Sequence, residues 1–231
     1  MMTIAQNLAD VKSRINAAAI RSSRNPSEVT LVAVSKVHSS DAIEAALATG
    51  QRHFGENYAQ ELADKHKKLS HYPDIVWHFI GHLQRNKAKL VVPSGAVIET
   101  LDSLRLAHVL SNEAARRDLT LSVLIQVNVG NEEQKSGIAS EALPSLLDEL
   151  EKTERIKPVG LMTIPPWHLE AEETRRYFAA LRRLRDRHGG EARLPHLSMG
   201  MSHDFEEAVE EGATLVRVGS AIFGRRPPKK R

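Results

Sequence analysis

The sequence predicts an α/β protein built as a single (β/α)8 barrel of the TIM type, and two observations support this fold class. Short apolar runs alternate with longer amphipathic segments about eight times along the chain, which is the pattern of consecutive strand and helix units. Polar side chains follow these apolar runs, at the positions that form the active face of a barrel. An open, doubly wound sheet has a similar alternation and is the alternative fold.

The predicted strands are short and apolar. Residues 31–34, Leu-Val-Ala-Val, show no polar alternation, which is typical of a strand covered on both faces in a parallel sheet. We expect strands at 30–36, 52–56, 75–80, 96–99, 122–129, 159–163, 196–199 and 214–218.

The segments between these strands have the spacing of amphipathic helices. We expect helices at 1–15, 42–48, 58–69, 83–90, 103–116, 140–151, 170–188 and 204–211, and a short apolar helix after Ser220. No Pro-, Gly- or Ser-rich linker divides the chain. We therefore expect residues 1–224 to form one domain and the basic segment 225–231 to be a disordered tail.

Composition excludes several classes of function. The chain has no cysteine, which excludes disulfides, a thiolate nucleophile and cysteine-ligated zinc, and fits a cytoplasmic location. The formal net charge is only +3, with 32 basic and 29 acidic residues. Because no nucleic-acid reading motif accompanies the basic residues, we expect no nucleic-acid partner. Charged residues interrupt the apolar spacing of segment 1–15, which predicts an amphipathic helix rather than a signal peptide, and no stretch is apolar for long enough to span a membrane.

Lys36, at the end of the first predicted strand, is a candidate for covalent chemistry. A desolvated lysine amine loses its proton readily and can condense with a carbonyl group to form a Schiff base. The alternative is a solvated residue at a strand boundary. Other polar residues share its position at a predicted strand end: Asn57, His78, Asn128, Thr163, Ser198, Ser202, Arg217 and Ser220.

Two glycine-serine turns follow the last two predicted strands, at 198–202 and at Gly219 and Ser220. Backbone N–H groups at a helix N-terminus bind phosphate, and the loops after strands seven and eight are the usual phosphate site of a barrel. Each turn taken singly also fits a simple helix cap. Together with Lys36, the two turns predict a phosphorylated carbonyl ligand.

A metal site is not predicted. His78 and His82 are four residues apart, but they straddle a predicted strand end and Gly81 rather than lying on one helix. The chain also has no His-Glu-x-x-His motif.

Seven motifs in order, from the first strand to Gly224, resemble those of the YggS/PROSC family of pyridoxal phosphate homeostasis proteins. They are LVAVSK (31–36), FGENY (54–58), WHFIGHLQRNK (77–87), KSGI (135–138), GLMTIP (160–165), LSMGMS (197–202) and VRVGSAIFG (216–224). The resemblance covers nearly the whole chain.

This resemblance implies a pyridoxal-5′-phosphate barrel of fold type III, similar to the N-terminal domain of alanine racemase. Lys36 would carry the cofactor as a Schiff base, and Asn57 would line its ring. The phosphate would be held by Ser202, Gly219 and Ser220, with Ser198 nearby. Arg217 would face the pyridine nitrogen. Because a guanidinium keeps its proton, the ring nitrogen would stay unprotonated and the cofactor would be a weak electron sink.

The resemblance further implies a carrier rather than an enzyme. Alanine racemase needs a second domain and a tyrosine base, whereas Tyr58, Tyr72 and Tyr177 lie on predicted helices or a loop. We expect a monomer that binds pyridoxal phosphate and supplies or buffers it, with pyridoxal-phosphate-dependent apoenzymes as recipients. The alternatives are a weak amino-acid racemase or transaminase that uses the same Schiff base, and a barrel for another sugar phosphate.

Overall fold

The computed structural model describes residues 2–130, 136–166 and 169–224. The predicted tail at 225–231 and Lys135 of the KSGI motif lie outside the described residues.

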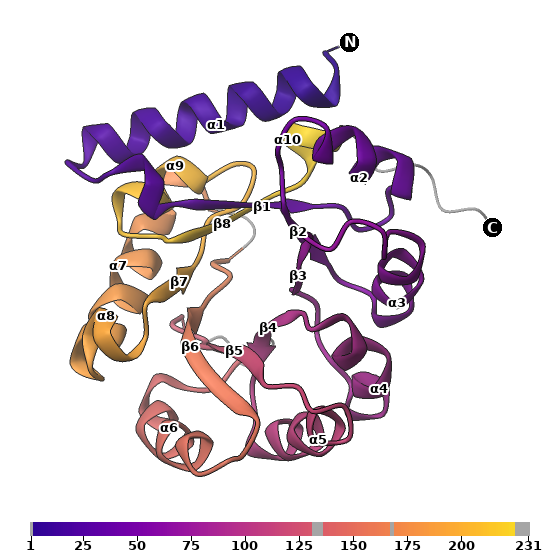
Figure 1. The fold of residues 1–231 in the computed structure, drawn as a ribbon. Coiled ribbons are helices and arrows are strands. Elements are labelled where there is room, and N and C mark those ends of the chain that lie inside the picture. The colour runs from indigo at the N-terminus through magenta and orange to yellow at the C-terminus, as the bar shows by residue number, and fades with distance from the viewer. Residues whose placement is uncertain (1, 131–135, 167–168, 225–231) are drawn as a thin grey trace.

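Eight parallel strands form a closed barrel in which each strand pairs with the next along the chain and β1 pairs with β8 (Figure 1). The strands are β1 (Thr30–Val34), β2 (His53–Glu56), β3 (Val76–Phe79), β4 (Val97–Leu101), β5 (Leu121–Gln126), β6 (Ile156–Met162), β7 (His196–Ser198) and β8 (Leu215–Val218). Because the sheet closes on itself, the predicted (β/α)8 barrel is confirmed and the open doubly wound sheet is wrong.

Helices surround this barrel (Figure 1). They are α1 (Ile4–Arg21), α2 (Ser40–Leu47), α3 (Ala59–Lys68), α4 (Ala88–Val91), α5 (Leu104–Ala115), α6 (Leu143–Glu151), α7 (Ala171–Arg187), α8 (Gly190–Arg193), α9 (Phe205–Glu210) and α10 (Ser220–Phe223), with 3-10 turns η1 (Pro26–Glu28), η2 (Arg85–Lys87), η3 (Val92–Ser94) and η4 (Ser140–Ala142). No described helix combines the length and the apolar character that crossing a membrane requires.

Among the predicted boundaries, the ends of the first strand and of the first helix are wrong. Strand β1 ends at Val34 rather than at Lys36, so the lysine lies on the turn that follows the strand. Helix α1 runs six residues past the predicted end at Ile15, to Arg21, because the alanines after Ile15 favour helix and two of them are buried.

The larger apolar core lies between the strands and the surrounding helices, and a smaller cluster of five buried side chains is separate from it. That smaller cluster is Val32, Leu124, Val159, Met162 and Leu215. Strands β6 and β7 approach closely where Gly160 pairs with His196, since a Cβ at position 160 would lie 2.1 Å from the His196 carbonyl oxygen.

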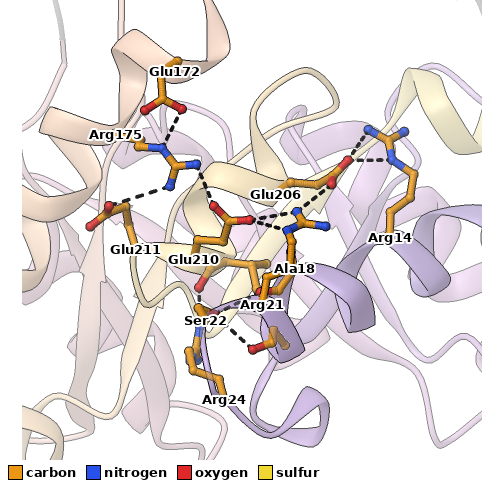
Figure 2. Close-up of polar contacts among 12 residues, drawn as sticks. Arg14, Ala18, Arg21, Ser22, Arg24, Glu172, Arg175, Glu206, Glu210 and Glu211 are labelled. Carbon is orange, nitrogen blue, oxygen red and sulfur yellow. Dashed lines mark hydrogen bonds and ion pairs between the residues drawn. The ribbon is translucent and has the colours of Figure 1, made fainter.

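Helix α1 is docked on the outside of the barrel against α9 and α10. Its buried face includes Leu8 and Val11. Ion pairs also join α1 to α9 (Figure 2), among them Arg21 to Glu206 at 3.0 Å and Arg21 to Glu210 at 2.8 Å. Because the Arg21 side chain is 52% exposed, apolar burial contributes more to the docking than these pairs do.

Candidate functional site

A cavity of about 370 Å³ opens at the carboxyl ends of the barrel strands. Its walls come from the carboxyl ends of β1 and β8 and from the segments that follow β1, β2, β3, β6, β7 and β8. The residues that line it are Val34, Lys36, His38, Asn57, Ile80, Ile164, Met201, Ser202, His203, Arg217, Gly219, Ser220 and Gly224. Six of the seven residues predicted for the site therefore lie around one cavity, and the seventh, Ser198, lies outside it.

Lys36 reaches the cavity from the turn after β1. The backbone before it continues the sheet, because the Ser35 N–H donates to the Gly55 carbonyl oxygen at 3.0 Å. Ser35 is fully buried and Lys36 is half-buried. Lys36 is thus presented from the turn that directly follows a barrel strand, as site residues of this fold generally are.

The two predicted glycine-serine turns meet on another wall of the cavity. The Gly219 N–H donates to Ser202 Oγ at 3.3 Å, which joins the turn after β7 to the turn after β8. Helix α10 begins directly afterwards, at Ser220. The first N–H groups of a helix have no partner within it, so this wall combines hydroxyl and amide donors that suit a phosphate.

Arg217 is 4% exposed; it lines the cavity and also lies in the barrel interior. Its guanidinium donates to Ser198 Oγ at 2.5 Å and to the Thr163 carbonyl oxygen at 3.0 Å. Ser198 Oγ in turn donates to Glu99 Oε2 at 2.6 Å. The structure therefore places Ser198 beneath the cavity, where its hydroxyl links Arg217 to a buried carboxylate.

This hydrogen-bond chain continues through the barrel interior to two histidines. Glu99 Oε1 lies 2.7 Å from His78 Nδ1, and His78 Nε2 lies 3.0 Å from His53 Nδ1. Burial acts to raise the pKa of Glu99, but the hydrogen bond and charge of His78 and the charge of Arg217 together lower it. Burial, followed by repulsion from His78, lowers the pKa of His53 to about 4. Glu99 is thus held as the carboxylate that balances the buried Arg217.

Asn57 follows β2 and has an unusual environment. Its Oδ1 atom is buried and has no hydrogen-bond partner among the described residues. Gly81 packs tightly against the Asn57 backbone, since a Cβ atom added to Gly81 would lie 2.1 Å from the Asn57 carbonyl oxygen. A buried, unsatisfied acceptor on a cavity wall fits a ligand that carries a hydrogen-bond donor.

The sequence prediction missed several residues of this region. His38, Met201 and His203 line the cavity, and Glu99 supplies the buried carboxylate. Glu99 had a detectable signal, since it is a charged residue at the end of a predicted apolar strand at 96–99. His38 and His203 had none beyond their nearness in sequence to Lys36 and Ser202.

Outside this cavity, the described residues form no metal site. Among residues 2–130, 136–166 and 169–224, no three His, Asp or Glu side chains come together as metal ligands. A second cavity of about 430 Å³ lies between α1 and the amino ends of β1 and β2. It contains none of the predicted site residues.

The fold and the lysine-lined cavity define a class, the barrels of the alanine racemase N-terminal domain type. The family model described as "Alanine racemase, N-terminal domain" matches residues 7–227. The alanine racemase of Corynebacterium glutamicum superimposes with a TM-score of 0.71 over 99% of this chain and 62% of that chain. At 19% identity, that likeness concerns the fold alone.

Two proteins of higher sequence identity indicate the family within this class. The pyridoxal phosphate homeostasis protein of Escherichia coli strain K12 is 42% identical over 100% of both chains. The structure of PipY of Synechococcus elongatus with pyridoxal phosphate bound is 38% identical, with a TM-score of 0.80 over 96% of this chain and 100% of that chain. This chain belongs to the family of pyridoxal phosphate homeostasis proteins.

Proposed function

We propose that this protein binds pyridoxal 5′-phosphate in the cavity, holds it as a Schiff base on Lys36, and supplies or buffers it for other proteins. One observation carries the proposal. An amine, a buried guanidinium and two turns that bear hydroxyl and amide groups line a single cavity at the carboxyl ends of the strands, and the relative PipY has been solved with this cofactor bound.

The residues present fit the cofactor. The cavity of about 370 Å³ is within the usual range for small-molecule sites. Ser202, Gly219 and Ser220 would hold the phosphate, and Arg217 would donate to the ring nitrogen. The unsatisfied Oδ1 of Asn57 would accept a hydrogen bond from the ligand. When bound, the aldehyde would condense with the Lys36 amine, forming a C=N bond with loss of one water.

The residues around Lys36 favour a carrier over a catalyst. None of the described residues that line the cavity is a tyrosine, aspartate or glutamate, and Tyr58 is 55% exposed on the surface. Arg217, kept charged by Glu99, would leave the ring nitrogen unprotonated and the cofactor a weak electron sink. We place the protein in the cytoplasm as a monomer, with pyridoxal-phosphate-dependent apoenzymes as recipients.

One observation favours the alternative function, an amino-acid racemase or transaminase: His38 and His203 also line the cavity. A histidine is a competent proton acceptor near neutral pH. Incubation of the loaded protein with L-alanine in D2O distinguishes the two functions. A carrier leaves the α-hydrogen in place, whereas a racemase or transaminase exchanges it for deuterium.

The proposed site is tested by the visible spectrum of the purified protein and of Lys36→Ala, each before and after borohydride reduction. We expect a yellow band in the wild type, a reduced adduct that maps to Lys36, and neither in the variant. A wild type that stays colourless with added pyridoxal phosphate would overturn the proposal and favour a barrel for another sugar phosphate.

A further inference from the structure

Val37, the residue after Lys36, has a backbone conformation that valine rarely adopts. Its φ angle is +62°, in the left-handed region where a β-branched side chain is strained. Such a conformation persists only where surrounding contacts hold it, and it occurs preferentially at functional sites. Contacts from neighbouring residues must therefore hold the turn at Val37 in this conformation.

Helix α3 holds both peptide groups that flank the Cα of Lys36. On one side, the Val37 N–H donates to both carboxylate oxygens of Glu61, each at 3.0 Å. On the other side, Lys65 Nζ donates to the Ser35 carbonyl oxygen at 2.8 Å. Glu61 and Lys65 are one helical turn apart, and their charged atoms lie 3.8 Å from each other.

The Lys65 side chain that makes this contact is buried in the protein interior. Lys65 is 5% exposed, and its amine lies 2.7 Å from Glu56 Oε1. The Ser35 hydroxyl donates to the same Glu56 oxygen at 2.6 Å. A buried ammonium is tolerated only when such partners surround it, so the position of Lys65, and with it the Ser35 carbonyl, is strongly determined.

We propose that Glu61 and Lys65 are positioning residues that set the backbone of the turn at Lys36 and thereby aim its amine at the cofactor aldehyde. This role rests on the Schiff base proposed above. A purely structural ion-pair cluster would stabilise α3 against the barrel, but it would not require a strained valine immediately after the reactive lysine. With Glu61 removed, Val37 relaxes to a negative φ angle and Lys36 loses its alignment.

The test compares two probes on Glu61→Ala. Pyridoxal phosphate can form the Schiff base, whereas pyridoxamine phosphate has a similar ring and phosphate but an amine in place of the aldehyde. We expect the variant to bind pyridoxal phosphate roughly tenfold more weakly, to trap less cofactor on Lys36 with borohydride, and to bind pyridoxamine phosphate almost as the wild type does. The last result also shows that the variant is folded.

Two further variants make the test specific. Asp64→Ala removes an exposed carboxylate from the same helix and should leave both probes unaffected. Val37→Gly, combined with Glu61→Ala, should restore much of the Schiff-base formation, because glycine adopts the left-handed conformation without strain.

Three outcomes would overturn the inference: unchanged trapping in Glu61→Ala, an equal loss for both probes, or no rescue by Val37→Gly. Failure of the proposed function itself gives a different result, since the wild type would then trap no cofactor on Lys36. Glu61→Gln, which keeps one acceptor oxygen for the Val37 N–H, should give an intermediate loss. An unaltered Glu61→Gln alongside a defective Glu61→Ala would still support positioning by the hydrogen bond.

Discussion

At the scale of the residue, the buried pair of Arg217 and Glu99 is the main electrostatic feature of the site. Their closest charged atoms are 4.0 Å apart, with the Ser198 hydroxyl bonded to both. Both side chains are almost fully buried. Desolvating two charges is costly, so each is tolerated because the other, and the hydrogen bonds of Ser198 and His78, compensate for the lost water.

Replacing Glu99 tests this dependence. Glu99→Gln removes the negative charge and leaves Arg217 charged and buried, so we expect a loss of about 3–5 kcal/mol in the free energy of unfolding, measured by urea denaturation. Glu149→Gln breaks an exposed ion pair with Lys152 and should leave the free energy of unfolding almost unchanged. A similar loss in both variants would mean that Arg217 is neutralised by another group.

At the scale of the element, apolar burial and ion pairs contribute unequally to the docking of α1 on the barrel. Leu8 is 1% exposed on the face turned to the barrel. We expect Leu8→Ala to cost about 2–5 kcal/mol through lost burial and the cavity left behind. Arg21→Ala removes its exposed ion pairs with Glu206 and Glu210 and should cost much less, because solvent screens exposed charges.

Salt separates the two contributions to α1 docking. Urea denaturation at low and high ionic strength should show the Arg21→Ala effect shrinking as salt is added, since exposed charges are screened. The Leu8→Ala effect should not shrink. A larger loss in Arg21→Ala than in Leu8→Ala would mean that the ion-pair network of Figure 2 dominates the docking.

At the scale of the whole molecule, stability depends on pH through groups that act in opposite directions, among them the half-buried His53 and the buried Glu56. The pKa of His53 is lowered to about 4 by burial and by His78. As the pH falls from 6.5 towards 4, the unfolded chain binds a proton that the folded protein does not, so the folded state loses stability. Burial raises the pKa of Glu56 to about 7 against the opposing effect of Lys65, so its contribution to stability is lost as the pH rises from 4.5 to 7.

Replacing His53 should reduce the loss of stability on the acid side of this profile. In His53→Asn, the melting temperature should fall less steeply than in the wild type between pH 6.5 and pH 4, because the residue that resists protonation is gone. His108→Asn, at an exposed position of α5, is the matched control. If the two variants have the same slope as the wild type, another group is responsible for acid sensitivity.

The order and kind of the elements, and most of the candidate site, follow from patterns in the amino-acid sequence. Eight buried apolar runs separated by amphipathic helices can bury their surface only as a covered parallel sheet, and the carboxyl ends of such strands must meet. For that reason, the sequence alone predicts that six strand-end residues share one site, and all six line the cavity: Lys36, Asn57, Ser202, Arg217, Gly219 and Ser220.

Tertiary structure alone decided the closure of the barrel and the contacts that lie across it. Ser198 follows the same strand-end pattern as the other predicted residues, yet the closed barrel turns it to Arg217 and Glu99 beneath the cavity. Glu61 reaches Val37 over 24 positions of the sequence. No local pattern encodes such pairs, because which strand faces which across a barrel is fixed by closure and register, and these depend on the packing of the whole chain.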